Sequence, residues 1–166
     1  NPEGGIVNHV LSLVGIQGPG WWTDPAWAIP SIILASAWKD LGFVMVILLA
    51  GLQAIPEDYY EAAAVDGAGR WARFRRITLP LLSPTTYFIL VVSMIGAFKI
   101  FALPLFLTGG GPLERTFTIV YSIYQQGFQY FRMGYAAAQA YALFAVIFLI
   151  TMLQRRVIAS RVHYDT

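Results

Sequence analysis

The polar residues of this sequence lie in two kinds of places, and neither has the pattern of a catalytic centre. Lys39, Asp40 and Lys99 lie inside long apolar runs, and a charged interval (residues 57–76) separates the first two runs. The sequence contains no His-Glu-x-x-His, Gly-x-Ser-x-Gly or P-loop motif, and both histidines lie outside the apolar runs. Those motifs are typical of metalloproteases, serine hydrolases and nucleotide-binding proteins. We therefore expect no catalytic residue, no metal site and no cofactor on this chain.

The composition indicates a membrane protein. Of the 166 residues, 57% are hydrophobic and 12% are charged, and the mean hydropathy is +0.60. A soluble domain carries about a quarter charged residues. The net charge of +2 gives no strongly basic surface, so a nucleic-acid partner is not expected. Because cysteine is absent, disulfides and thiolate metal sites are excluded, and the redox compartment stays undecided.

Three apolar runs are long enough to cross a bilayer as helices, which requires about 20 residues. They cover residues 28–51, 85–107 and 135–153. The alternative is three buried helices of a soluble protein, but such helices need polar faces that these runs do not have. The sequence predicts an all-α membrane protein with three transmembrane helices.

The basic residues of the connecting segments predict the orientation. Segment 52–84 carries four arginines and the tail 154–166 carries three, whereas residues 108–134 carry two and residues 1–27 carry no Lys or Arg. Basic residues are enriched in cytoplasmic loops. We therefore expect the charged interval and the tail to be cytoplasmic, and segments 1–27 and 108–134 to lie outside.

Aromatic residues precede the first and third runs and predict short helices at the outer membrane surface. They are Trp21, Trp22, Trp27, Tyr121, Tyr124, Phe128, Tyr130 and Phe131. The stretch TGGGP (residues 108–112) is predicted to form a tight outer loop. A phosphate-binding loop is the weaker interpretation, because no Lys-Ser or Lys-Thr follows the glycines.

The charged interval is predicted to form two short helices joined by a glycine turn. Pro56 suits the start of a helix, and Gly67 offers the left-handed conformation that commonly ends one. Residues 70–77 can form a second helix, which Pro80 is expected to end. Ser83 then begins the next helix, the second apolar run.

The surface of this interval allows two interpretations from composition alone. Ala62, Ala63 and Ala64 make the first helix slim, so a partner can approach closely, and Glu61 could pair with a basic residue of that partner. Arginine and aromatic residues are frequent anchors of protein interfaces. The same arginines could instead hold an amphipathic helix on anionic lipid. The aromatic residues concerned are Tyr59, Tyr60, Trp71 and Phe74.

In the charged interval, Glu61-Ala62-Ala63 is followed after three residues by Gly67, and after nine more by Ile77-Thr78-Leu79-Pro80. This spacing resembles the EAA signature of binding-protein-dependent ATP-binding-cassette (ABC) importer permeases. The resemblance implies a cytoplasmic coupling helix that docks on a separate ATPase subunit. The residues that it assigns to this coupling are Glu61, Ala62, Ala63, Gly67, Ile77, Leu79 and Pro80.

The resemblance extends over nearly the whole chain. The stretches GFVMVILLAGLQAIPEDYYEAAAVDGA, ITLPLLSPT and LTGGGP are similar to the carbohydrate and glycerol-phosphate branch of these permeases. Members usually have six or more spans, so the chain is expected to be the C-terminal half of a permease in a bacterial or archaeal plasma membrane. The implied partners are ABC ATPase subunits that carry the ATP, a second identical or different permease subunit, and an extracytoplasmic solute-binding protein. The implied cargo is a sugar or related polyol.

Polar residues inside the predicted spans are candidates for a substrate pathway, because such residues are costly in a membrane and usually functional. The candidates are Ser36, Lys39, Asp40, Ser93, Gly96 and Lys99, with Trp38, Phe43 and Phe98 as aromatic faces for a sugar. Gln139 and Tyr141 are the polar residues of the third run. Structural alternatives are close helix packing at Ser93 and Gly96, and a lysine that reaches the headgroups.

A second class of function is a membrane scaffold subunit that transports nothing. It would sit in the same bilayer with the same partners. The two classes differ in one measurable property, since only a transporter subunit predicts that substrate stimulates ATP hydrolysis by the assembled complex.

Overall fold

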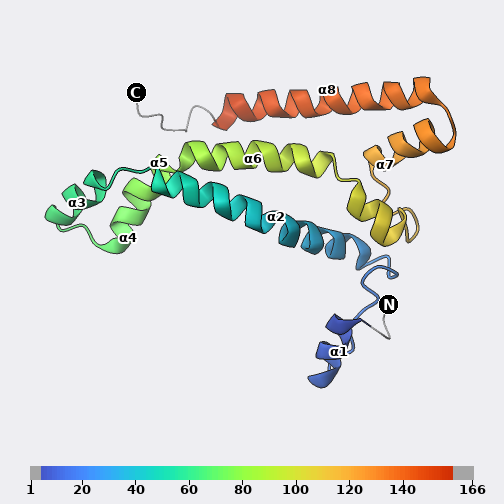
Figure 1. Ribbon diagram of the computed structural model, residues 1–166, viewed down its shortest axis with the longest axis horizontal. Coiled ribbons are helices and arrows are strands. Elements are labelled where there is room, and N and C mark those ends of the chain that lie inside the picture. The colour runs from blue at the N-terminus through green and yellow to red at the C-terminus, as the bar shows by residue number, and fades with distance from the viewer. Residues whose placement is uncertain (1–4, 159–166) are drawn as a thin grey trace. The chain divides into compact units, whose positions relative to one another are not determined.

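The structure, a computed structural model, describes residues 5–158, and this part of the chain consists of helices and connecting segments without a β-strand (Figure 1). The chain divides into two compact units, which are described separately: Asn1–Lys39 with Phe98–Ala145, and Asp40–Ala97 with Val146–Thr166. The elements, with η for a π-helical turn, are α1 (Ile6–Leu13), α2 (Ala28–Gln53), α3 (Asp58–Val65), α4 (Arg70–Arg73), η1 (Phe74–Thr78), α5 (Leu79–Leu81), α6 (Ser83–Phe98), η2 (Pro104–Thr108), α7 (Ile119–Tyr124), η3 (Gln125–Gln129) and α8 (Met133–Ile158).

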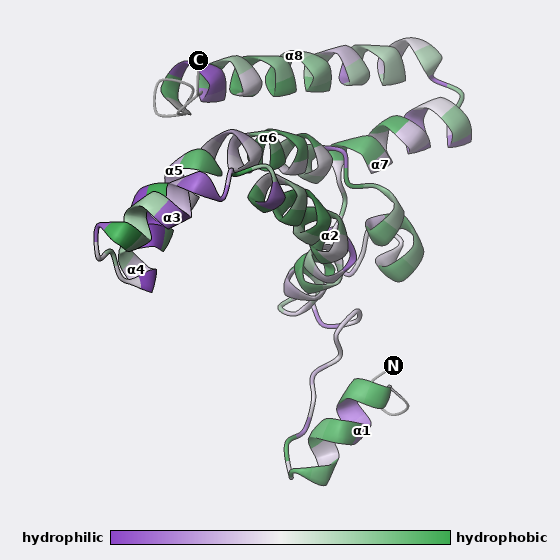
Figure 2. Cartoon of the chain, turned by 60° about the vertical axis from the view of Figure 1, so that its left-hand side comes forward, coloured by the Kyte–Doolittle hydropathy of each residue, from purple (hydrophilic) through white to green (hydrophobic). Residues whose placement is uncertain are grey.

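The first and third predicted spans are single long helices, α2 and α8. Each has 26 residues, so each is about 39 Å long and can cross a hydrocarbon core of about 30 Å. Only 6% of the apolar window of either helix is buried in this chain. Figure 2 shows hydrophobic residues along these helices and hydrophilic ones gathered on α3 and α4. Residues 5–158 do not cover these surfaces, which agrees with helices that face lipid or other protein.

The second predicted span differs from the structure. Helix α6 has 16 residues and ends at Phe98, whereas we expected one helix over residues 85–107. The physical reason is Pro104, which has no N–H to donate to the carbonyl of Ile100. That carbonyl instead accepts a hydrogen bond from the Thr118 hydroxyl at 3.0 Å. By length and composition α6 qualifies as a third span only together with the bent segment before it, Arg70–Leu81.

That preceding segment corrects a second expectation, which concerns Pro80. We expected Pro80 to end the second helix of the charged interval, but the helical backbone runs through it to Leu81. The turn before the proline is π-helical, with the Leu79 N–H bonded to the Phe74 carbonyl. This wider turn relieves the clash of the proline ring with the preceding turn. The bend comes one residue later, where Arg70–Leu81 and α6 meet at 58°.

Helices α2 and α6 approach closely at Gly51 in the second unit. A Cβ atom at Gly51 would lie 2.6 Å from Thr85 Oγ1 and 3.0 Å from Leu82 Cδ1. Glycine therefore lets the backbone of α2 contact the Thr85 and Leu82 side chains, and any larger residue would push them away. Ile55 and Leu82 are buried beside it. This contact forms the base from which the charged interval projects.

The first unit contains the predicted tight loop after Thr108. The Thr108 and Thr116 hydroxyls are hydrogen-bonded at 2.6 Å, and the Tyr121 hydroxyl donates to the Gly109 carbonyl at 3.1 Å. A Cβ at Gly110 would lie 2.6 Å from the Tyr121 ring, so the loop folds directly against α7. The prediction of a tight loop is confirmed.

Candidate functional site: the charged interval

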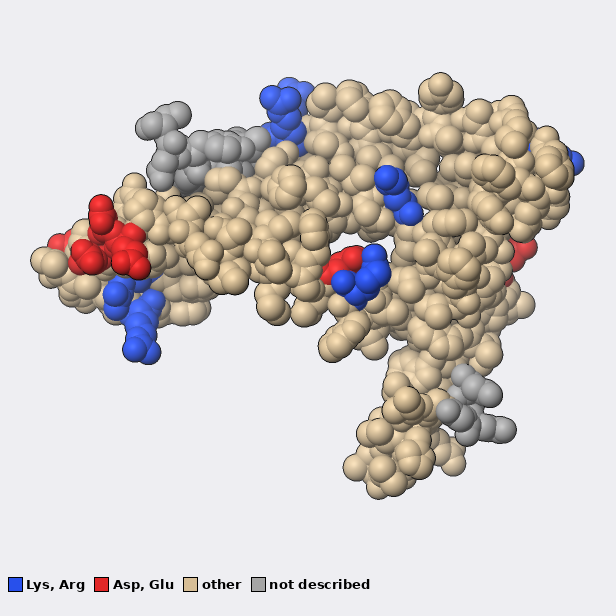
Figure 3. Space-filling view, viewed as in Figure 1, with Lys and Arg blue, Asp and Glu red and all other residues tan. Residues whose placement is uncertain are grey.

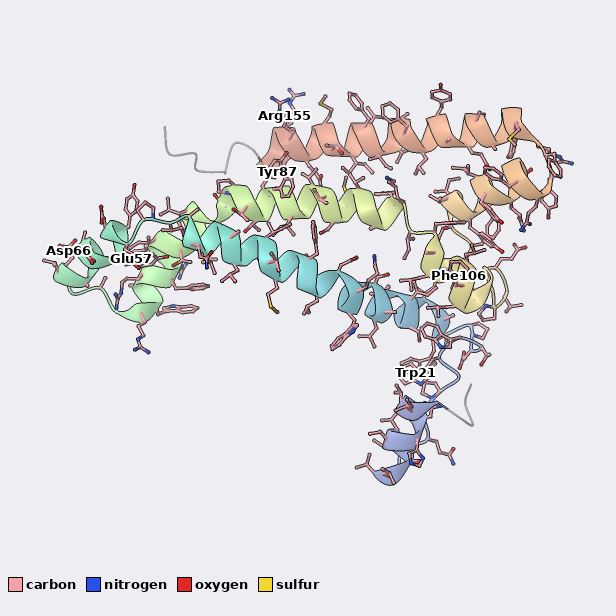
Figure 4. The ribbon with its side chains drawn as sticks, viewed as in Figure 1. Trp21, Glu57, Asp66, Tyr87, Phe106 and Arg155 are labelled. Atoms are coloured by element: carbon pink, nitrogen blue, oxygen red, sulfur yellow. The ribbon has the colours of Figure 1, made fainter. Side chains whose placement is uncertain are left out.

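Helix α3 forms the exposed end of the charged interval. It begins after Glu57, and Asp58 and Glu61 lie in its first turn, where the helix dipole favours acidic side chains. Glu57 and Asp66, labelled in Figure 4, flank the helix at its two ends. All four acidic side chains are exposed. The predicted short acidic helix is therefore present, and it is free for an external contact.

Gly67 ends α3 with the conformation that the sequence predicted. Its φ is +75°. The Gly67 N–H bonds the Ala64 carbonyl at 3.1 Å, and the Ala68 N–H bonds the Ala63 carbonyl at 2.9 Å. This pair of bonds defines a Schellman motif, which satisfies the last carbonyls of the helix. A Cβ at Gly67 would meet no atom within 4 Å, so glycine is required for its backbone conformation and not for space.

The alanines of α3 give the helix small side chains, which allow another protein to approach its backbone closely. Ala62 and Ala64 are exposed and Ala63 is half-buried, and no residue of α3 is buried. Within residues 5–158, α3 therefore presents Glu61, Ala62 and Ala64 outward without a covering element. A slim exposed helix at the end of a loop is a suitable insert for a groove on another protein.

One hydrogen bond joins α3 to the segment that leads into α6. The Tyr60 hydroxyl lies 2.9 Å from the Thr78 hydroxyl. Thr78 is buried, and Tyr60 is half-buried. Thr78 lies in η1 directly before α5 and α6, so this hydrogen bond connects α3 to the segment that leads into α6. The sequence analysis missed this pair, because the two residues are 18 positions apart and no local pattern joins them.

The second half of the signature lies close to this joint. Ile77 and Pro80 are half-buried, whereas Leu79 is exposed. The two halves of the signature thus have different surroundings. Glu61, Ala62 and Gly67 face outward on or beside α3, and the later residues line the connection to α6.

The basic half of the interval has a separate surface. Arg70, Arg75 and Arg76 are exposed, and Trp71 stacks on Phe74 with ring centroids 5.6 Å apart. Figure 3 shows the acidic side chains at this end of the chain as one group, with basic side chains next to it. Within the described residues, no ion pair joins the acids of α3 to these arginines.

The candidate pathway residues fall on different elements and in both units. On α2, the Ser36 hydroxyl is buried without a described hydrogen-bond partner, and Lys39 and Asp40 are exposed. Ser93 and Gly96 are exposed on α6, one turn apart, and a Cβ at Gly96 would meet no atom within 4 Å. Packing at Gly96 within this chain is therefore not observed, and the pathway assignment stays a prediction. The remaining candidate, Lys99, is exposed just beyond the end of α6.

The polar residues of the third run have unequal surroundings. Gln139 Nε2 donates to the Ser122 hydroxyl at 3.0 Å and so joins α8 to α7. Tyr141 is exposed. Within residues 5–158, no group of three or more metal-ligating side chains occurs. His163 and Arg161 lie outside the described residues.

The chain matches one family model over residues 6–164, that of the "binding-protein-dependent transport system inner membrane component". Among curated proteins, it is 41% identical to the sulfoquinovosyl glycerol transport system permease protein SmoG of Agrobacterium fabrum, over 96% of this chain and 52% of that protein. It is 39% identical to the sn-glycerol-3-phosphate transport system permease protein UgpA of the same organism, over 99% of this chain and 56% of that protein.

Two solved structures share the fold. A bacterial ABC transporter involved in the import of the acidic polysaccharide alginate matches with a TM-score of 0.79 and 31% identity, over 95% of this chain and 57% of that chain. The same kind of transporter in complex with an alginate pentasaccharide-bound periplasmic protein gives a TM-score of 0.82 at 31% identity, over 94% and 55%. The chain thus spans about half the length of the proteins that it matches.

Proposed function

Because this chain belongs to the family of binding-protein-dependent transport system inner membrane components, we propose that it is part of the permease subunit of an ABC importer. In this role the chain contributes spans to the translocation path and receives mechanical work from a separate ATPase. ATP binds to and is hydrolysed on that partner. The family and the apolar helices make the chain a multi-pass inner membrane component.

The observation that carries the proposal is the link between α3 and α6. An exposed helix that carries the Glu61-Ala62-Ala63 sequence ends at the left-handed Gly67, and Tyr60 joins it to Thr78 at the base of α6. A docked ATPase that moves α3 therefore moves the start of a membrane helix. ATP can shift the equilibrium between two transport states only if it binds one of them better.

We propose a sugar or polyol derivative as cargo, by extension from relatives named for sulfoquinovosyl glycerol and sn-glycerol-3-phosphate. Ser36, Lys39 and Asp40 on α2 are the proposed pathway residues of that helix, and Ser93, Gly96 and Lys99 those of α6 and the segment after it. Hydroxyl and charged side chains can replace the hydration shell of a polyol inside the membrane. The proposed partners are ATPase subunits, a second permease subunit and an extracytoplasmic solute-binding protein.

The coupling role of α3 is tested by a charge reversal at Glu61 in the full-length permease. We expect Glu61→Lys to abolish uptake and to reduce the amount of ATPase that copurifies with the permease, while membrane insertion persists. The matched control is Glu114→Lys, which makes the same change at an exposed acid of the first unit. The control is expected to retain the ATPase. Normal uptake with Glu61→Lys would refute the proposed coupling.

The scaffold alternative gives a different result in the same preparation. A permease that only holds the assembly together would keep its ATPase, but the assembled complex would hydrolyse ATP at the same rate with and without solute-binding protein and substrate. We expect stimulation by both together.

A further inference from the structure

The segment from Arg70 to Thr78 carries positive charges and aromatic side chains that have no part in the proposed docking of α3. It carries Arg70, Arg73, Arg75 and Arg76, and the sequence has no Asp or Glu between Asp66 and Glu114. The segment, here called the basic–aromatic segment, also carries Trp71 and Phe74. It is therefore the one part of the charged interval whose charge is of a single, positive sign.

The arginines of this segment have few partners in the described part of the chain. Arg70, Arg75 and Arg76 are exposed, and Nε of the half-buried Arg73 has no described hydrogen-bond partner. The acids of α3 form no ion pair with them in that range. Four guanidinium groups near one another repel, and an anionic partner removes this repulsion.

The aromatic pair identifies the kind of anionic partner. Trp71 is 73% exposed and Phe74 is 42% exposed, although the two rings stack on each other. Tryptophan is enriched at the headgroup level of membranes, where an apolar ring with one polar group is favoured. Arginines beside such rings match a bilayer surface of phosphate groups above acyl chains.

The bend before α6 gives the basic–aromatic segment a direction that suits contact with the membrane surface. The helical backbone of Arg70–Leu81 is inclined by 58° to α6. With α6 along the membrane normal, an inclination of 58° means that the axis of the segment is closer to the membrane plane than to the membrane normal. A straight continuation of α6 past Ser83 would instead carry the arginines out of the membrane along the α6 axis and away from the headgroups.

We propose that the basic–aromatic segment binds the phosphate groups of anionic phospholipids through Arg70, Arg75 and Arg76, with Trp71 and Phe74 inserted among the upper acyl chains. The acidic α3 would be repelled by the same lipids, which leaves it to the aqueous partner. The charged interval is thus divided between two partners, a protein at α3 and the bilayer surface at the basic–aromatic segment. This binding does not depend on the nature of the transported substrate.

The test uses the full-length permease in nanodiscs with brominated lipids, which quench tryptophan fluorescence by contact. The signal of Trp71 is the difference between the wild-type protein and Trp71→Phe. We expect brominated phosphatidylglycerol to quench Trp71 more strongly than an equal content of brominated phosphatidylcholine. In Arg75→Gln/Arg76→Gln the selectivity should fall several-fold, whereas Arg75→Lys/Arg76→Lys should retain it.

Arg155→Gln/Arg156→Gln is the matched control, because it removes two exposed arginines at the end of α8. This variant should leave the selectivity of Trp71 unchanged. Equal quenching by the two lipids in the wild-type protein would overturn the proposal. So would the absence of quenching in nanodiscs that contain the ATPase complex, since the segment would then be covered by protein. Copurification of the ATPase, measured in parallel, reports on the docking of α3 separately.

Discussion

At the scale of single residues, Gly67 determines where α3 ends. Its φ of +75° directs the chain back toward α4, and the bonds of Gly67 and Ala68 to the carbonyls of α3 depend on that conformation. A Cβ there meets no atom. Any other residue would therefore destabilise this turn through its strained backbone conformation and not through a steric clash. The neighbouring Gly69 has an ordinary φ of −67° and also meets no atom at its Cβ position.

These two glycines provide a matched pair of substitutions. We expect Gly67→Ala to destabilise the end of α3 by about 1 kcal/mol, because alanine is strained in the left-handed region. Gly69→Ala should be neutral or stabilising by about 0.5 kcal/mol. The measurement is the affinity of the purified ATPase for the permease. An equal effect of both substitutions would show that the conformation of Gly67 is not what positions α3.

Tyr60 is the second residue whose role can be isolated. Tyr60→Phe removes the hydroxyl that pairs with the buried Thr78. The loss of a hydrogen bond to a buried hydroxyl costs about 1 kcal/mol. We expect the permease to keep its ATPase but to transport less substrate for each ATP hydrolysed, because α3 moves without α6. Tyr59→Phe, a change at the exposed neighbour, should leave this ratio unaltered, and a similar loss there would contradict the assignment.

At the scale of elements, the contact of α2 with α6 fixes the base of the charged interval. Gly51 allows the backbone of α2 to lie against the Thr85 and Leu82 side chains. Gly42 lies in the same helix, and a Cβ there would meet no atom within 4 Å. Alanine substitutions at the two positions change helix propensity equally, and only the one at Gly51 affects the contact between α2 and α6.

We expect Gly51→Ala to lower the thermal stability and the transport activity of the permease, because the added methyl group would overlap Thr85. Overpacking of this kind costs about 1–3 kcal/mol. Gly42→Ala should be tolerated. Thr85→Ala combined with Gly51→Ala should restore part of the loss, since it removes both Thr85 atoms nearest the new Cβ. Full stability of Gly51→Ala alone would disprove the close crossing.

The elements also show what the sequence could and could not predict. Helices α2 and α8, the acidic helix α3 and the turn at Gly67 follow from local patterns of hydropathy, helix ends and glycine. The sequence analysis did not predict the end of α6, because hydropathy does not report hydrogen bonds. Pro104 has no N–H to bond the Ile100 carbonyl, and the Thr118 hydroxyl bonds that carbonyl instead.

The rest of the site depends on contacts between distant residues. Tyr60 with Thr78, and Gly51 with Thr85, meet only after the helices have packed. No periodicity in the sequence predicts such a pair. The charges of the sequence predicted the interval, but its division into an acidic helix and a basic–aromatic segment required the structure.

At the scale of the whole molecule, the apolar surfaces of the long helices α2 and α8 are not covered by the described part of the chain. In each long helix only 6% of the apolar window is buried. The chain also spans about half the length of its relatives, as does its match to the solved transporters. These facts agree with the proposal that the chain is part of a larger membrane permease in which α3 contacts an aqueous partner.

The proposal that α3 docks on a cytoplasmic ATPase is tested most directly by a single cysteine at Ala64, an exposed residue of α3 in a chain without cysteine. Ala64→Cys is placed in the full-length permease, with any cysteine outside these 166 residues replaced by serine, and is treated with a membrane-impermeant maleimide. We expect labelling in inside-out vesicles, loss of labelling when purified ATPase is added, and no labelling from the outer side. Glu114→Cys should show the opposite sidedness and no protection by the ATPase. Labelling of Ala64→Cys from the outer side, or equal labelling with and without the ATPase, would contradict the proposal.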